Sequence, residues 1–174
     1  MANAVTKIEE IASTSSSFTF TSIPATYDDL MIIGSTKTNH TSGNNLPPNS
    51  WYSRFNGDST SDYAFRWYGS YDAGFMGPLQ TSVSSIEVPG CASSWSSNAG
   101  WGHWWVHIPG YKDSSQKSGL MAGGWSQDSS TSSGSFRGSF NWNKTAAITS
   151  ILFGPVYGSF VTGTNATLYG ISNA

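Results

Sequence analysis

Charge is the scarcest property of this sequence. Charged residues make up 10% of its 174 residues, against about a quarter in an ordinary soluble domain. Exposed helix faces normally carry Glu, Lys and Arg, so the shortage argues against a helical protein. The eight basic residues are spread along the chain and form no stripe, which removes the usual electrostatic source of nucleic-acid binding. We therefore expect no nucleic-acid partner.

Cysteine and long apolar runs are also scarce. The single Cys91 allows no internal disulfide, and no group of Cys and His residues has the spacing of a metal site. No stretch approaches the roughly 18 consecutive apolar residues of a membrane span, and residues 1–17 lack the pattern of a secretion signal. We expect no metal, no cofactor, no membrane partner and synthesis in the cytoplasm.

Aromatic and small polar residues are abundant instead. Aromatics reach 14% with eight Trp, and Ser, Thr, Asn and Gly suit strands and turns. Residues 17–21 and 135–142 alternate between apolar and polar, which predicts half-buried strands. Residues 29–35 are apolar on both faces, which predicts a central strand. Residues 39–50, 92–100 and 126–134 have the composition of loops. We predict one all-β domain over 1–174 with eight to ten strands: a two-sheet antiparallel β-sandwich, jelly-roll-like.

Residues 101–108 predict a strand with two very different faces. Alternation places four residues on one face (Trp101, His103, Trp105 and His107) and three on the other (Trp104, Val106 and Ile108). The two histidines would stand about 13 Å apart, too far to chelate one metal. Trp101, His103, Trp105 and His107 are therefore candidates for a subunit interface or a glycan contact. The alternative is that they are core aromatics with satisfied ring nitrogens.

Residues 54–58, Arg-Phe-Asn-Gly-Asp, predict a tight turn. Asn56 and Gly57 adopt positive φ cheaply, so they suit the centre of a type I′ hairpin between residues 51–55 and 63–67. Phe55 would face the core and Arg54 the opposite side. We expect Arg54 to pair with a carboxylate, either Asp58, Asp62 or one from a neighbouring subunit.

Acidic residues near this turn allow two chemical alternatives. Asp58 and Asp62 could form the carboxylate pair of a glycosidase, or could bind Ca²⁺ together with Asn56. Turn chemistry explains both aspartates without catalysis. Nucleophile motifs such as Gly-x-Ser-x-Gly and phosphate-binding glycine loops are missing from the sequence. We therefore expect a protein that is not an enzyme.

Three stretches, in order, resemble a family of small structural proteins of tailed bacteriophages. Residues 18–30 are similar to the family's opening strand, Ile-Pro turn and Tyr-x-x-Leu. Residues 54–58, with Tyr63 following, are similar to its Arg-Phe-Asn-Gly-Asp turn. The Leu-Tyr-Gly-Ile at 168–171 is similar to its closing strand.

The resemblance implies a virion component made in the host cytoplasm. The family includes longer fibre-like proteins, but this sequence shows no anchor or coiled-coil stalk. We therefore expect a capsid decoration or cement protein whose partners are the major capsid protein or other virion proteins. A homo-oligomer is expected, with a trimer preferred because capsid surfaces offer local three-fold axes. Two alternatives stay open: a tail or receptor-binding module that contacts host glycans, and a glycan-binding module or glycosidase unconnected to a virion.

Overall fold

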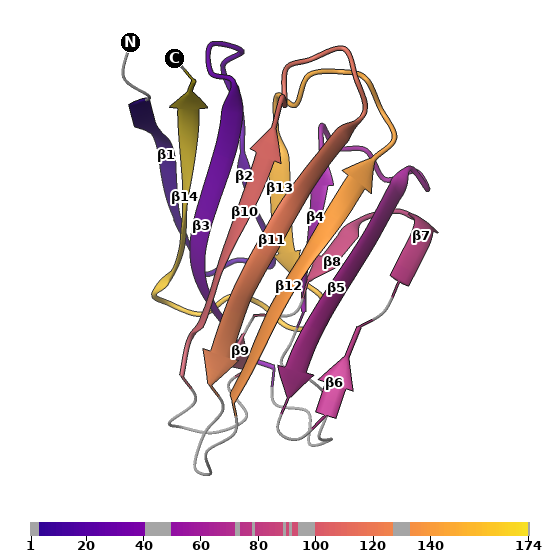
Figure 1. Cartoon of the computed structure of the whole chain (residues 1–174). Coiled ribbons are helices and arrows are strands. Elements are labelled where there is room, and N and C mark those ends of the chain that lie inside the picture. The colour runs from indigo at the N-terminus through magenta and orange to yellow at the C-terminus, as the bar shows by residue number, and fades with distance from the viewer. Residues whose placement is uncertain are drawn as a thin grey trace.

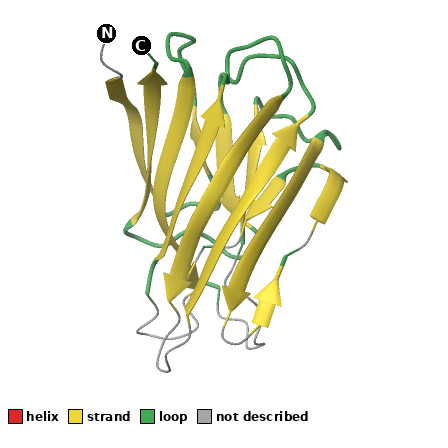
Figure 2. Cartoon of the chain, viewed as in Figure 1, coloured by secondary structure: helices red, strands yellow, loops and turns green. Residues whose placement is uncertain are grey.

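The computed structural model describes residues 4–40, 50–71, 74–77, 79–88, 90, 92–93, 100–126 and 133–173. These residues form fourteen strands and no helix (Figure 2), and none of them makes up a helix with the length and apolarity to cross a membrane. The all-β prediction is confirmed. More strands form than the eight to ten expected, because short strands lie between residues 74 and 93.

The strands divide into two sheets of unequal size that lie face to face (Figure 1). The large sheet follows the order β1 (Ala4–Ser13), β14 (Thr164–Ser172), β3 (Asp29–Thr38), β10 (Gly102–Pro109), β11 (Lys117–Ser126), β12 (Ser133–Trp142), β5 (Tyr63–Tyr71) and β6 (Gly74–Met76). Two further strands pair with it: β7 (Leu79–Val83) with β5, and β9 (Ala92–Ser93) with β3. The small sheet follows the order β2 (Phe18–Phe20), β13 (Ile151–Pro155), β4 (Trp51–Phe55) and β8 (Ile86–Val88).

Pairing is antiparallel throughout, except for the two-residue parallel contact between β3 and β9. The predicted antiparallel β-sandwich is therefore confirmed. A jelly roll has eight strands in two Greek keys, whereas these fourteen strands divide ten to four. The jelly-roll arrangement stays a prediction.

The core lies between the sheets and is largely aromatic. Trp104 of the large sheet packs against Trp51 and Phe153 of the small sheet, with ring centroids 4.7 and 5.2 Å apart. Alternation along each strand supplies these side chains. In β10, for example, Trp104, Val106 and Ile108 are buried while His103 and Trp105 are exposed.

β3 is a central strand, as predicted, since it lies between β14 and β10. Leu30 and Ile32 are fully buried, but Ile33 is 52% exposed. Only one face of β3 is buried, because the small sheet covers only one side of the large sheet. Most of the predicted loops (41–49, 94–99 and 127–132) and Cys91 lie outside the described residues.

The turn at residues 55–58 joins the two sheets and does not close a hairpin. Asn56 has a φ of 53° and Gly57 a φ of 69°, and the Asp58 amide donates to the Phe55 carbonyl at 2.9 Å. The strands on either side do not pair, since β4 belongs to the small sheet and β5 to the large one. The hairpin prediction is wrong. The sequence of a turn determines its own backbone geometry but not the pairing of the strands beside it, and β4 pairs with β13 and β8.

Asn56 also ties this turn to the chain that enters β13. Its side-chain oxygen accepts hydrogen bonds from the amides of Thr149 and Ser150 at 2.8 and 3.1 Å, and its amide nitrogen donates to the Ala147 carbonyl at 2.8 Å. The backbone amide of Asn56 donates to the Ser150 carbonyl at 3.0 Å. The Asn56 side chain therefore ties the turn that joins the two sheets to the chain entering β13.

We predict that Gly57→Val lowers the free energy of unfolding by about 1–3 kcal/mol, because a branched residue is strained at positive φ. No atom lies within 4 Å of a Cβ added at Gly57, so the cost is conformational and not steric. Gly57→Asn is the matched control and stays near wild type, since Asn tolerates this region. Urea denaturation measures both, and equal stability of the Val and Asn variants would contradict the assignment.

Candidate interaction surface

The outward face of the large sheet carries a row of side chains that cross five strands. Ile33 pairs with Trp105, Trp105 with Ala122, Ala122 with Arg137, and Arg137 with Tyr68. Directly paired residues point to the same face, with Cβ atoms about 4.5–5.5 Å apart. The row is therefore one continuous strip of neighbours on β3, β10, β11, β12 and β5.

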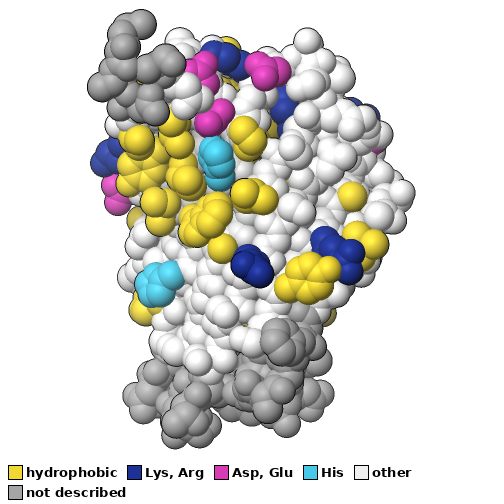
Figure 3. Space-filling model, viewed as in Figure 1, with side chains coloured by type: hydrophobic (Ala, Val, Ile, Leu, Met, Phe, Trp, Pro, Cys, Tyr) yellow, Lys and Arg dark blue, Asp and Glu magenta, His cyan; other side chains and the backbone are white. Residues whose placement is uncertain are grey.

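This strip and its surroundings are unusually apolar for a face open to solvent. Exposed fractions are 52% for Ile33, 37% for Trp105, 54% for Leu120 and 52% for Tyr68. Figure 3 shows hydrophobic side chains gathered on this face, with Lys and Arg side chains beside them. The inward residues of the same strands already fill the core, so the outward aromatic and aliphatic groups are not needed for the sandwich itself.

His107 lies in the next row, between Met31 and Leu120. Its Nε2 is 3.3 Å from an oxygen of Asp29, and the other Asp29 oxygen accepts a hydrogen bond from the Gly110 amide at 3.1 Å. Asp29 thereby connects the start of β3 to the end of β10 and fixes the orientation of the imidazole.

Of the four residues predicted as an interface, three share this outward face. His103, Trp105 and His107 all project from it, and His103 is exposed beside Ser35 and Gly124. Trp101 lies apart, before the start of β10, and its ring is within 3 Å of where a Cβ on Gly163 would stand. The alternative in which all four are core aromatics does not describe Trp105, whose partners Ile33 and Ala122 lie on the solvent side.

A shallow hollow of about 520 Å³ opens on the same face. Trp105 and Leu120 border it from β10 and β11, and Arg66, Tyr68 and Arg137 border it from β5 and β12. The guanidinium of Arg66 lies over the Tyr68 ring, 4.9 Å from its centroid. The hollow therefore combines aromatic surface with two cations.

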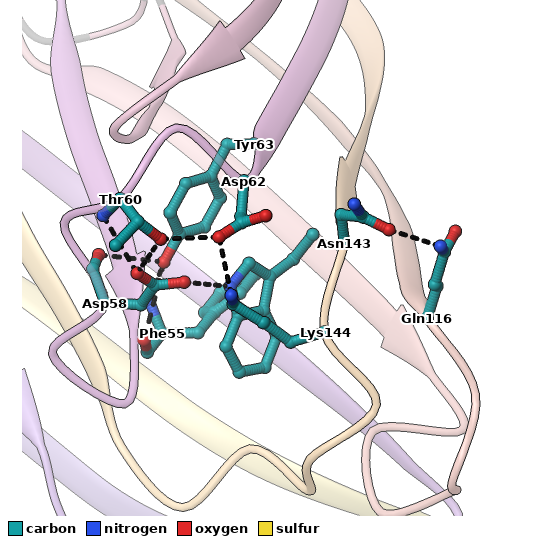
Figure 4. Close-up of polar contacts among 9 residues, drawn as sticks. Phe55, Asp58, Thr60, Asp62, Tyr63, Gln116, Asn143 and Lys144 are labelled. Atoms are coloured by element: carbon teal, nitrogen blue, oxygen red, sulfur yellow. Dashed lines mark hydrogen bonds and ion pairs between the residues drawn. The ribbon is translucent and has the colours of Figure 1, made fainter.

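Asp58 and Asp62 take part in a polar network where the chain crosses from one sheet to the other (Figure 4). The Asp58 carboxylate accepts from the Thr60 amide at 2.9 Å and from the indole of Trp142 at 2.8 Å. The Thr60 hydroxyl lies between Asp58 and Asp62, at 2.5 and 2.6 Å. Lys144 forms an ion pair with Asp62 at 2.6 Å.

These contacts hold both aspartates in their ionised form. Burial raises the pKa of Asp58, but hydrogen bonds from Thr60 and Trp142 outweigh it and hold that pKa below its usual value. Lys144 and then Thr60 lower the pKa of Asp62, and the same ion pair raises the pKa of Lys144. Burial raises the pKa of Tyr63 to about 12.

The network gives no support to either chemical alternative. A glycosidase needs one carboxyl with a raised pKa to act as the acid, and here both are lowered. The calcium alternative requires Asn56 to face Asp58 and Asp62, but its amide group is taken up by residues 147–150. Among the described residues, no three His, Cys, Asp or Glu side chains are grouped as a metal site.

Arg54 contacts neither Asp58 nor Asp62, and its pairing with a carboxylate of a neighbouring subunit stays a prediction. Its Nε donates to the Ser84 carbonyl at 3.1 Å, and its guanidinium lies 5.3 Å from the centroid of the Tyr52 ring. The predicted pairing with Asp58 or Asp62 is wrong, because Lys144, Thr60 and Trp142 already occupy those carboxylates.

Sequence reasoning missed several residues of the outward face. Ile33, Arg66, Tyr68, Leu120 and Arg137 were not singled out, although strand alternation already placed Arg137 on the side opposite Phe136. The missing information was the register that brings β3, β10, β11, β12 and β5 together.

No protein-family model, curated protein or solved structure matches this chain.

We predict that acid weakens the fold through the aspartate network. A lowered folded pKa contributes stability that is present above the unfolded value of about 3.9 and is lost as pH falls through the folded pKa. The melting temperature should therefore fall steeply below about pH 4, and Asp58→Asn should flatten that dependence. Glu87→Gln is the control, because the exposed side chain of Glu87 makes no hydrogen bond or ion pair among the described residues. An unchanged slope in Asp58→Asn would refute this account.

Proposed function

We propose that this protein is a structural component of a tailed-bacteriophage virion, and specifically a capsid decoration or cement protein that works by assembling. The observation that carries the proposal is the exposed apolar strip on the outward face of the large sheet. The resemblance of residues 18–30, 54–58 and 168–171 to phage structural proteins supports the same conclusion.

An open face of this kind favours association. Contiguous apolar surface on a soluble protein marks an interaction site, and covering it with a partner contributes about 25 cal/mol per Å² buried. Ile33, Trp105 and Leu120 are exposed neighbours on adjacent strands. A protein with few surface charges has little to oppose such contacts, because charge repulsion between copies is weak.

One edge of the large sheet, at β1, is protected, which favours contact through the face. The outer strand β1 carries Lys7 and Glu10 as an ion pair and has a bulge between Lys7 and Glu9. Charged side chains and bulges hinder pairing between sheet edges of different molecules. Neighbours in an assembly would therefore meet over β3, β10 and β11, and not by extending the sheet beyond β1.

The chemistry of the acidic residues supports a role without catalysis. The carboxylates of Asp58 and Asp62 form hydrogen bonds and an ion pair that hold the turn between the two sheets. Their lowered pKa values make them poor proton donors. A second candidate function is a tail or receptor-binding module that contacts host glycans. It is favoured by the exposed rings of Trp105 and Tyr68 beside one hollow.

We predict that the purified protein sediments as an oligomer, with a trimer expected, and that Ile33→Glu weakens its self-association by about tenfold or more. A carboxylate placed in an apolar contact loses its hydration, and 1.4 kcal/mol already corresponds to a factor of ten. Analytical ultracentrifugation measures the change. Glu87→Lys, which alters charge on the outer side of the small sheet, is the control and leaves assembly intact.

Mass spectrometry of purified particles from the encoding phage tests the virion assignment. Many copies per particle are expected, with fewer retained by the Ile33→Glu variant. A strictly monomeric protein that is missing from the particles would overturn the proposal.

A further inference from the structure

The basic residues of this chain differ in whether they pair with a carboxylate or a carbonyl oxygen. Lys7, Lys112 and Lys144 form ion pairs with Glu10, Asp28 and Asp62. The buried Lys117 donates to the carbonyls of Asp113, Ser115 and Thr145, and Arg54 donates to Ser84. Lys37 makes contacts of its own. Arg66 and Arg137 pair with no carboxylate or carbonyl among the described residues.

These two arginines lie together. Arg137 of β12 pairs with Tyr68 of β5. Arg66, two residues before Tyr68, pairs with Ser139, two residues after Arg137. Both are exposed on the outward face of the large sheet and both border the hollow. In a protein with so few charges, two unneutralised cations at one place define a local positive site.

Aromatic rings stand on either side of this site. In the row defined above, Ala122 and Arg137 lie between Trp105 and Tyr68. The Cα atoms of Trp105 and Tyr68 are therefore about 14 Å apart at the usual strand spacing. Between them Ala122 contributes only a methyl group to the outward face. The space between the exposed rings is therefore lined mostly by apolar groups, with the two arginines and Ser139 as its polar part.

We propose that this hollow binds an acidic saccharide, a glycan that carries carboxylate groups. A guanidinium forms paired hydrogen bonds with a carboxylate, and Arg66 is already held in place by stacking on Tyr68. Trp105 offers a flat surface on which the apolar face of a sugar ring can lie, and the Ser139 hydroxyl can exchange hydrogen bonds with sugar hydroxyls. A volume of about 520 Å³ is in the range of small-molecule sites.

Other ligand classes fit the hollow less well. Nucleic-acid binding depends on many phosphate contacts along a basic surface, and this site has two cations. A purely apolar ligand would leave both guanidinium groups desolvated without a partner, which is costly. The inference deepens the second candidate function, since it assigns a class of glycan to the same hollow. This hollow shares Trp105, Arg137 and Tyr68 with the strip that carries the assembly proposal.

Calorimetric titration of the full chain with oligogalacturonate, and with a neutral maltooligosaccharide of equal length, tests the inference. We expect binding of the acidic probe that weakens with added salt, and at least tenfold weaker binding of the neutral one. Arg66→Gln, Arg137→Gln and Trp105→Ala should each reduce affinity for oligogalacturonate about tenfold or more. Arg54→Gln, on the other sheet, is the matched control and should bind as wild type.

Circular dichroism and melting temperature establish that each variant is folded. Equal binding of the neutral probe, no binding of the acidic one, or unchanged affinity in both arginine variants would overturn the inference. So would arginine variants that lose self-association or particle binding while saccharide affinity stays the same, because the hollow would then receive a protein carboxylate. Loss of saccharide binding with assembly intact would support the inference and leave the virion proposal standing.

Discussion

The contact of Trp104 with the small sheet is the interaction on which the rest of the structure depends. Its ring meets Trp51 and Phe153 across the core, and its indole nitrogen donates to the Thr36 hydroxyl at 3.1 Å. Gly34, opposite Trp104 on β3, makes room for the ring, since a Cβ there would lie 2.2 Å from it. One position therefore fixes the distance between the sheets, the register of β10 on β3 and the direction of every neighbour along β10. Because Trp104 points inward, Trp105 must point outward.

Local pattern was enough to predict the fold class and the faces of individual strands. The alternation at 101–108 separated Trp104 from Trp105, and the Asn56-Gly57 pair indicated positive φ where the structure has it. Sheet membership could not be predicted in the same way. The order of β4 and β5 in the chain suggested a hairpin, but β4 is held by β13, some hundred residues later, and no local signal encodes that choice. The hollow depends on three separate registers, so neither Arg66 nor Tyr68 could be placed beside Trp105 from sequence.

The scarcity of charge takes on a different meaning once the structure is known. Individual lysines stabilise individual turns and loops. Lys144 forms an ion pair with Asp62 at the turn between the sheets, and Lys117 donates hydrogen bonds to three carbonyls of the loops at 113–115 and 145. Burial lowers the pKa of Lys117, yet its hydrogen bonds keep it useful as a donor inside the fold. A chain that places its charges so sparingly leaves the outward face of the large sheet to aromatic and aliphatic groups, with Arg66 and Arg137 as its cationic part.

The strand order also constrains when the protein can fold during its synthesis. β14 lies between β1 and β3, and β13 lies between β2 and β4, so an inner position of each sheet is filled by one of the last two strands in the chain. While the ribosome is still making residues 151–172, the early strands have no native neighbour at those positions and expose unpaired edges. Neither sheet can close until these residues emerge, which makes folding a late, concerted event dominated by contacts between distant parts of the chain. In a cell that makes many copies at once, the interval before β13 and β14 insert is when nascent chains are most exposed to one another.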